Sequence, residues 1–240
     1  MIQFSAKHDG RLYPSQRNQL SYEHGIATYA MCEAYTLTKD PVLRPVVEKA
    51  VSIIIRRQNS MGGWYYGYGG GNTDMSVTGW NVQALKAAHL TGLKINGLET
   101  ALDRAAACCK KMQHSSGEWI YQSDSRKVHP TLTGVGVFCL QMWKNAASDE
   151  VRKGAKVLTQ KKSYRDIYEC YYNTMACFQR GGITWGTWNK VFQPALLRSQ
   201  NRDGSWPEGP RKLGADHGPY ETALSVMTLE VYYRYLPSIN

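Results

Sequence analysis

The chain has 240 residues, of which 42% are hydrophobic and 20% are charged, a balance typical of a folded domain rather than a disordered segment. It contains no run of about 18 apolar residues, so we expect no transmembrane segment. The 29 lysines and arginines exceed the 19 aspartates and glutamates and give a net charge of +10, which favours acidic partners. The basic residues are scattered and form no nucleic-acid motif, so we expect no binding to nucleic acid.

The hydrophobic pattern predicts helices in consecutive pairs, separated by breaks at glycine, proline and polar residues. The first helix of each pair is apolar nearly all round, whereas the second has a single apolar face. In chain order the predicted helices are Tyr22–Leu37, Pro41–Arg57, Asp74–Leu90, Leu98–Met112, Pro130–Trp143, Asp149–Thr159, Asp166–Gln179, Trp188–Ser199 and His217–Tyr235.

One short pattern, Q-x3-G-x-W, closes three of the four predicted pairs. It occurs at Gln58–Trp64, Gln113–Trp119 and Gln200–Trp206. The turn expected after the third pair, Gln160–Tyr164, lacks both the glycine and the tryptophan. Repetition of this kind indicates a helical repeat protein.

Enclosed helices that alternate with half-exposed ones predict two concentric layers. We therefore predict an all-α fold, a partial or near-complete α/α toroid with five inner and four outer helices. Residues 1–240 are expected to form a single α/α-toroid domain, either alone or as a segment of a longer chain. An incomplete ring would expose apolar inner-helix surface and favour a partner chain or self-association.

The cysteines give a prediction about the compartment. None of the six forms a C-x-x-C pair, and most lie within apolar helical sequence, which favours buried, reduced thiols. The N-terminal residues Met1–His8 lack the apolar core of a signal peptide. Together these features favour a cytosolic location, and they suggest neither a cofactor nor a resident metal ion.

The three Q-x3-G-x-W turns between paired helices resemble those of the terpenoid cyclase and protein prenyltransferase superfamily, in particular squalene-hopene-cyclase-like repeat proteins. The resemblance extends from Tyr22 to Leu236. It implies that the turn glutamines and tryptophans brace successive helices. It also implies that the N-terminal ends of the inner helices line the mouth of a central cavity. The mouth residues would be Glu23, His24, Asp74, Ser76, Thr78, Trp80, His129, Thr131, Glu169, Cys170, Asp216, His217, Tyr220 and Glu221.

Asp74 is the candidate catalytic residue under this resemblance. The acid motif D-x-D-D-T-A of class II terpene cyclases corresponds to Asn72–Val77, where the middle acid is Asp74 but its acidic neighbours are replaced by Asn72 and Met75. Protonation of an alkene needs a very strong acid, tuned by its neighbours. The simpler interpretation is that Asp74 is the N-cap of the helix that follows.

Two further enzyme classes stay open. A zinc site of the prenyltransferase type would need a group such as Asp166 or Glu169 with Cys170 and His217, although a plain buried role for Cys170 is simpler. A toroid polysaccharide lyase would suit the positive charge, since its substrate is a polyanionic glycan. Basic and acidic candidates for the lyase chemistry follow the last turn, at Arg211, Lys212 and Asp216.

The glycine- and tyrosine-rich loop Tyr65–Asn72 precedes one inner helix. It is interpreted either as a mobile lid that stacks aromatic rings on a ligand or as a plain connector. The favoured function is a binding or scaffold role through the toroid cavity, with catalysis lost or altered and with a hydrophobic or peptide-like ligand. The alternatives are a cyclase-like enzyme that uses Asp74 as general acid and a polysaccharide lyase. The candidate ligand-binding residues are His24, Trp80, His129, Cys170, His217, Tyr220 and Glu221.

Overall fold

A computed structural model describes residues 1–13, 20–67, 71–125, 127–209 and 218–234. These residues form an all-α structure, as the sequence predicts. Its helices are α1 (Ile2–Lys7), α2 (Leu20–Thr38), α3 (Arg44–Arg56), α4 (Met75–Leu90), α5 (Leu98–Lys111), α6 (Leu132–Met142), α7 (Asp149–Thr159), α8 (Ile167–Arg180), α9 (Gly182–Arg198), α10 (Gly218–Leu229) and α11 (Val231–Arg234).

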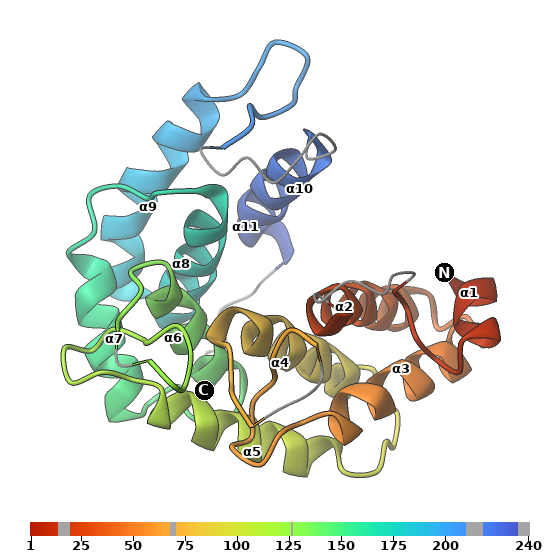
Figure 1. Cartoon of the computed structure of the whole chain (residues 1–240). Helices are drawn as coiled ribbons and strands as arrows, with labels where there is room; N and C mark the ends of the chain where they lie inside the picture. The colour runs from red at the N-terminus through yellow and green to blue at the C-terminus, as the bar shows by residue number, and fades with distance from the viewer. Residues whose placement is uncertain (14–19, 68–70, 126, 210–217, 235–240) are drawn as a thin grey trace.

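The helices form two concentric layers. Helices α2, α4, α6, α8 and α10 follow an inner arc, and α3, α5, α7 and α9 pack outside it (Figure 1). Helices α2 and α10 stand at the two ends of the arc, with α2 packed against α4 and α10 against α8. This arrangement confirms the predicted α/α toroid.

Burial explains why each helix takes its layer. Every residue of α6 from Leu132 to Gln141 is buried, because α4, α7 and α8 surround it. The outer helix α5 buries one face, through residues such as Leu98, Leu102 and Cys109, and exposes the opposite face. The all-apolar and amphipathic patterns of the sequence therefore correspond to the inner and outer layers.

The repeated turn ties each hairpin to the next. Gln58 Nε2 donates to Gly62 O within the turn and to Ala101 O in α5, each at 2.8 Å. Trp64 Nε1 donates to Ile54 O at 2.9 Å. A side chain on Gly62, whose φ is +94°, would place its Cβ 2.3 Å from a backbone oxygen of α5, so only glycine fits this left-handed position.

The other two turns repeat these bonds. The indoles of Trp119 and Trp206 donate to Cys109 O and Leu196 O at 2.8 and 2.9 Å. Gln113 donates to Gly117 O and to Glu150 O in α7. The motif is thus a structural brace between neighbouring hairpins.

An ion pair stands where the third turn lacks the motif. Lys161 Nζ lies 2.5 Å from Glu169 Oε1, and the Glu169 side chain has no exposed area. Lys161 also donates to Pro130 O at 3.5 Å, and Glu169 accepts from Arg165 N at 3.0 Å. The pair therefore joins the loop after α7 to the first turn of α8 and to the segment before α6.

Helix boundaries differ from the predictions at a few positions. Helix α1 was not predicted, and α9 begins at Gly182 rather than at Trp188. The break expected between Gln179 and Trp188 is much shorter in the structure, because Gly181, at a φ of +69°, ends α8 and starts α9 directly. No helix in the described ranges is long and apolar enough to cross a membrane.

Candidate functional site

The inner helices begin at one end of the toroid, which we call the mouth. Backbone hydrogen bonds join the segments that precede them. Ser21 N, at the start of α2, donates to Tyr66 O at 3.0 Å, and Met75 N, at the start of α4, donates to Tyr121 O at 2.9 Å. Together with the Lys161 bridge between the starts of α6 and α8, these bonds bring four repeats together at the mouth.

Five tyrosines from five successive repeats gather at the mouth: Tyr22, Tyr66, Tyr121, Tyr168 and Tyr220, the tyrosine cluster. Tyr22 stacks on Tyr66 with ring centroids 6.5 Å apart, and the Tyr66 and Tyr121 hydroxyls lie 2.5 Å apart. The Tyr22 hydroxyl interacts with Tyr168, and Tyr168 in turn interacts electrostatically with Tyr220. Four of these rings are half-buried, whereas Tyr168 is only 5% exposed.

The cluster is a set of protonated hydroxyl groups. Burial raises the pKa of Tyr22 and of Tyr168 well above its usual value. Burial also raises the pKa of Tyr66 and of Tyr121, and the nearby Asp74 carboxylate adds to both shifts. At neutral pH these four hydroxyls therefore keep their protons and can donate hydrogen bonds.

Asp74 lies beneath two of these tyrosines and is fully buried. Its Oδ1 accepts from Ser76 N at 2.9 Å, Ser76 Oγ at 2.6 Å and Val77 N at 3.1 Å. Its Oδ2 accepts from Gln122 Nε2 at 3.2 Å. These contacts are those of an N-cap on α4, extended by a bond to the loop that precedes α6.

Trp80 lies one turn further into α4 and is 3% exposed. Its ring stacks on Tyr171 at 5.9 Å and meets Tyr172 edge-on at the same distance. Gln83 accepts from Tyr171 OH at 2.8 Å and donates to Tyr172 OH at 2.7 Å. Large aromatic side chains thus fill the space below the tyrosine cluster.

Two buried donors in this region lack a well-formed partner. Trp80 Nε1 and Tyr168 OH both approach the Tyr22 hydroxyl, yet neither makes a hydrogen bond of normal geometry to the described residues. An unsatisfied buried donor costs about 1–3 kcal/mol.

The other predicted site residues separate into distinct places. His24 is fully buried between α2 and α3, where its ring contacts Leu12 N and Ala50 O. Cys170 is buried in α8, and burial raises its pKa. Glu221, at the start of α10, accepts from Gly209 N at 3.1 Å. His217 lies outside the described residues, as do Arg211, Lys212 and Asp216.

His129 and Tyr220 both lie at the mouth, and their role in binding a ligand stays a prediction. The His129 ring lies 5.5 Å from that of Tyr121, and both are half-buried. The loop Tyr65–Asn72 also reaches the mouth through Tyr65 and Tyr66, although its residues 68–70 lie outside the described ranges. Within those ranges no three His, Cys, Asp or Glu side chains are grouped as a metal site requires.

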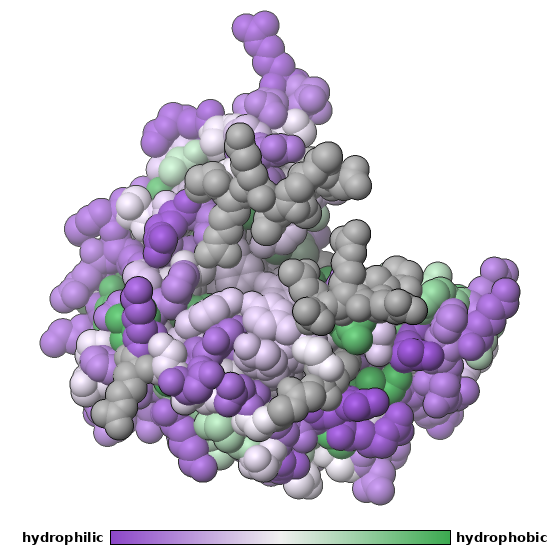
Figure 2. All heavy atoms as spheres, in the orientation of Figure 1, coloured by the Kyte–Doolittle hydropathy of each residue, from purple (hydrophilic) through white to green (hydrophobic). Residues whose placement is uncertain are grey.

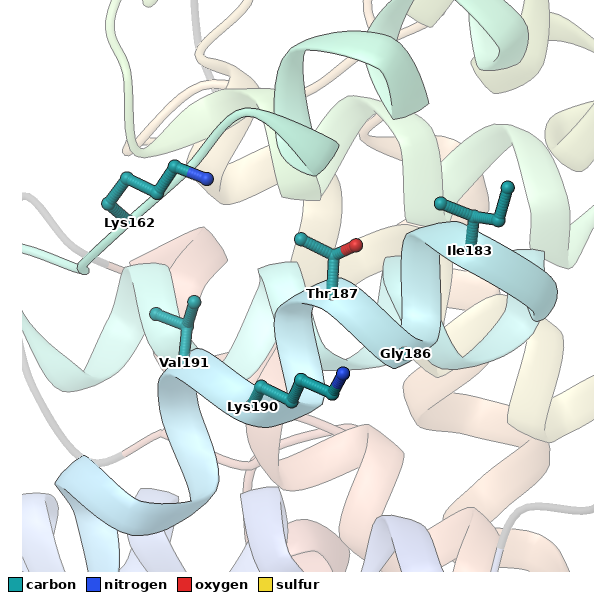
Figure 3. A pocket seen from close by; sticks show the side chains of 6 residues that line it. All are labelled: Lys162, Ile183, Gly186, Thr187, Lys190 and Val191. Carbon is teal, nitrogen blue, oxygen red and sulfur yellow. The ribbon is translucent and has the colours of Figure 1, made fainter.

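The middle of the face in Figure 2 carries pale, weakly hydrophilic side chains, and strongly hydrophilic ones surround it. Elsewhere a shallow groove of about 530 Å³ runs along α9, lined by Lys162, Ile183, Thr187 and Lys190 among others (Figure 3). Within the described residues, the side chains that line this groove form no hydrogen bonds with one another, whereas those of the mouth do. The mouth is therefore the better candidate site.

Comparison with known proteins supports the fold. No protein-family model matches the chain, and no curated protein is similar to it in sequence. The GH76A α-1,6-mannanase of Salegentibacter sp. HEL1_6 superposes with a TM-score of 0.67 over 90% of this chain and 77% of its own, at 10% identity. Its inactive variant in complex with α-1,6-mannotetrose gives 0.65 over 90% and 76%, at 11% identity. A glycosyl hydrolase family 88 protein from Bacteroides vulgatus gives 0.52 over 95% and 65%, at 10% identity.

These neighbours correct the predicted family. They are α/α toroids of carbohydrate-active enzymes, not terpenoid cyclases or protein prenyltransferases, so the family inferred from the Q-x3-G-x-W turns is wrong. The turns hold neighbouring hairpins together, so the motif indicates the fold and does not indicate which reaction or ligand the protein has. The mannanase variants hold α-1,6-mannotetrose and α-1,6-mannotriose, neither of which is a hydrophobic or peptide-like ligand of the kind predicted from the sequence.

The catalytic residues of the mannanase do not carry over directly. Its inactive variants have two consecutive aspartates replaced. The present chain has no two consecutive aspartates anywhere in its sequence. The shared feature is therefore the toroid itself, and function must be argued from the mouth of this chain.

Proposed function

We propose that this protein binds a carbohydrate chain at the mouth of its toroid, through the tyrosine cluster. The observation that carries the proposal is the convergence of five tyrosines from five repeats on one end of the ring. A tyrosine offers an apolar ring and a polar hydroxyl on one stiff side chain. A sugar has the matching surfaces, with C–H groups on its faces and hydroxyls around its edge.

The surroundings of the cluster suit an uncharged polyol better than an apolar ligand. Tyr66 and Tyr121 keep their protons and can donate, and Gln122 supplies an amide within 3.2 Å of Asp74. Trp80 Nε1 and Tyr168 OH add two buried donors without well-formed bonds. An apolar ligand would offer no partner to Trp80 Nε1 or Tyr168 OH and would cover the other polar groups without bonding them, at a free-energy cost.

Cleavage of the bound glycan by elimination is a second candidate. It is favoured by the Tyr66–Tyr121 hydroxyl pair, since a protonated tyrosine can donate its proton to a leaving glycosidic oxygen. In that reaction His129, whose ring lies 5.5 Å from that of Tyr121, would accept the proton next to a uronate carboxyl group, the C–O bond would break as a C=C bond forms, and the tyrosine would protonate the leaving oxygen. Incubation with an acidic polysaccharide would produce an unsaturated sugar with ultraviolet absorbance, and Tyr121→Phe would abolish it.

The binding proposal is tested with Tyr66→Ala. Loss of a stacking ring and its hydroxyl should weaken the binding of α-1,6-mannotetrose or an oligogalacturonate by about tenfold, measured by calorimetric titration. Tyr233→Ala is the matched control, because Tyr233 is 91% exposed and lies on α11, away from the cluster. Equal affinities of the two variants for every glycan bound by the wild type would refute a role for the cluster.

A further inference from the structure

A second polar site lies between the turn after α1 and the outer helix α3. This cleft has a volume of about 300 Å³ and is lined by the side chains of Arg11, Arg56, Arg57, Tyr13, His8 and Asp9, with Ile53 at its apolar wall. We call it the arginine cleft. Three arginines and a tyrosine thus line one small volume.

The three arginines of the cleft have almost no polar partners among the described residues. Within the described residues, none of them forms an ion pair within 4.0 Å, and the one side-chain hydrogen bond is from Arg11 Nε to His8 O at 3.2 Å. Among the described residues that line the cleft, Asp9 is the one carboxylate, so three arginine charges stand against a single negative charge. An arginine fork matches the two oxygens of a carboxylate or sulfate group.

The walls of the cleft are held in place by buried contacts. Gly10 is buried at a φ of +86°, and a Cβ there would lie 2.6 Å from the Lys49 side chain on α3. His24 Nδ1 accepts from Leu12 N at 3.3 Å, and the His24 ring meets Tyr13 edge-on at 5.6 Å. The segment that carries Arg11 and Tyr13 is therefore docked on α3 rather than loosely attached.

Two of the arginines that line the cleft lie near the end of the toroid that carries the tyrosine cluster. Arg56 and Arg57 end α3, directly before the first Q-x3-G-x-W turn, which leads to the mouth. His24, against which Tyr13 packs, lies two residues from Tyr22 of the cluster. A glycan at the mouth would thus have a cationic site at the outer rim of the same end.

From these observations we infer that the arginine cleft binds an oxyanion substituent, a carboxylate or sulfate, of an acidic glycan. The inference that the anion belongs to a glycan rests on the proposed function, whereas the anion chemistry of the cleft does not. The net charge of +10 also favours the binding of an acidic glycan, since it attracts polyanions over a longer range than the cleft alone.

The experiment compares Arg56→Gln/Arg57→Gln with Arg198→Gln/Arg202→Gln. Both pairs are exposed, both follow the same end of an outer helix, and both changes remove two charges. The probes are an oligogalacturonate, a sulfated disaccharide, inorganic sulfate and α-1,6-mannotetrose, titrated at constant ionic strength. We expect the cleft variant to lose about tenfold in affinity for the anionic probes and nothing for mannotetrose, and the control to match the wild type.

Each result separates the two proposals. Equal losses in both double variants would show a diffuse charge effect and overturn the cleft, as would unchanged affinity in the cleft variant. Sulfate binding that depends on Arg56 and Arg57, without binding of any sugar, would support the arginine cleft as an anion site and refute the proposal that the protein binds a glycan. Glycan binding that depends on Tyr66 but not on the arginines would keep the proposed function and refute the cleft.

Discussion

At the scale of single residues, His24 shows how a buried polar group can make stability depend on pH. Its Nδ1 accepts from Leu12 N, so the neutral ring carries its proton on Nε2, which donates to Ala50 O at 3.0 Å. Burial lowers the pKa of His24 from 6.5 to about 4. Protonation would remove the acceptor and place a charge in an enclosed site.

The sign of the pH dependence follows from that shift. Between pH 6.5 and about 4 the unfolded chain binds a proton at this histidine that the folded chain excludes. The stabilisation is therefore complete above pH 6.5 and is lost as the pH falls, by up to about 3 kcal/mol. Urea unfolding at a series of pH values should show this loss, and His24→Gln should reduce it. A variant with the same pH profile as the wild type would contradict the assignment.

Asp74 is a fully buried carboxylate that caps the first turn of α4. Four donors surround its carboxylate, three from the first turn of α4 and one from Gln122. We propose that Asp74 positions the Tyr66–Tyr121 pair. It caps α4 and, by accepting from Gln122, holds the loop that precedes α6. The N-cap alternative from the sequence accounts for its contacts without a catalytic step.

At the scale of the elements, the repeated turn predicts that its three glutamines contribute unequally to the free energy of unfolding. Gln58 and Gln113 each donate both to their own turn and to the next outer helix, whereas Gln200 donates to Gly204 O within its turn. With about 1 kcal/mol per hydrogen bond, Gln58→Ala and Gln113→Ala should each cost about 2 kcal/mol, and Gln200→Ala about half as much. Urea unfolding with unchanged m-values measures the difference, and equal costs would contradict the brace.

The helices could be predicted because burial leaves a periodic trace in the sequence, as in the wholly apolar α6 and the one-sided α5. The turn motif likewise predicted which hairpins are braced. Its chemistry could not be read in the same way, because a brace is shared by toroids of unrelated function. The Lys161–Glu169 pair was missed for another reason: it joins segments whose proximity only the folded ring creates.

The candidate site was predicted only in part. Tyr220 and His129 were expected at the mouth, but Tyr22, Tyr121 and Tyr168 were not recognised as partners of Tyr66. A signal was present, because a tyrosine occurs within the first three residues of α2, α8 and α10. Convergence of side chains from separate repeats is a property of the folded arc, and the sequence of one repeat does not contain it.

At the scale of the whole molecule, the cysteines can report how the toroid opens. All six are buried and reduced, and burial raises the pKa of both Cys32 and Cys108 to about 12, so their thiolate fraction is very small. A thiol-reactive reagent should therefore label none of them rapidly in the native protein and all six in denaturant. Rapid labelling under native conditions would contradict this burial.

The order of labelling tests whether the arc opens from its ends. Cys32 and Cys139 are almost equally buried, at 0% and 1% exposure, so any difference in rate reflects opening rather than access in the folded state. Cys32 lies on α2 at one end of the arc, whereas Cys139 lies on α6 with inner helices on both sides. In a repeat array each unit is stabilised by its neighbours, so an end unit opens more often than a central one. Mass spectrometry of labelling in low urea should therefore show Cys32 modified before Cys139. Simultaneous modification would mean that the toroid opens as one cooperative unit, braced along its length by the repeated turns and the Lys161–Glu169 pair.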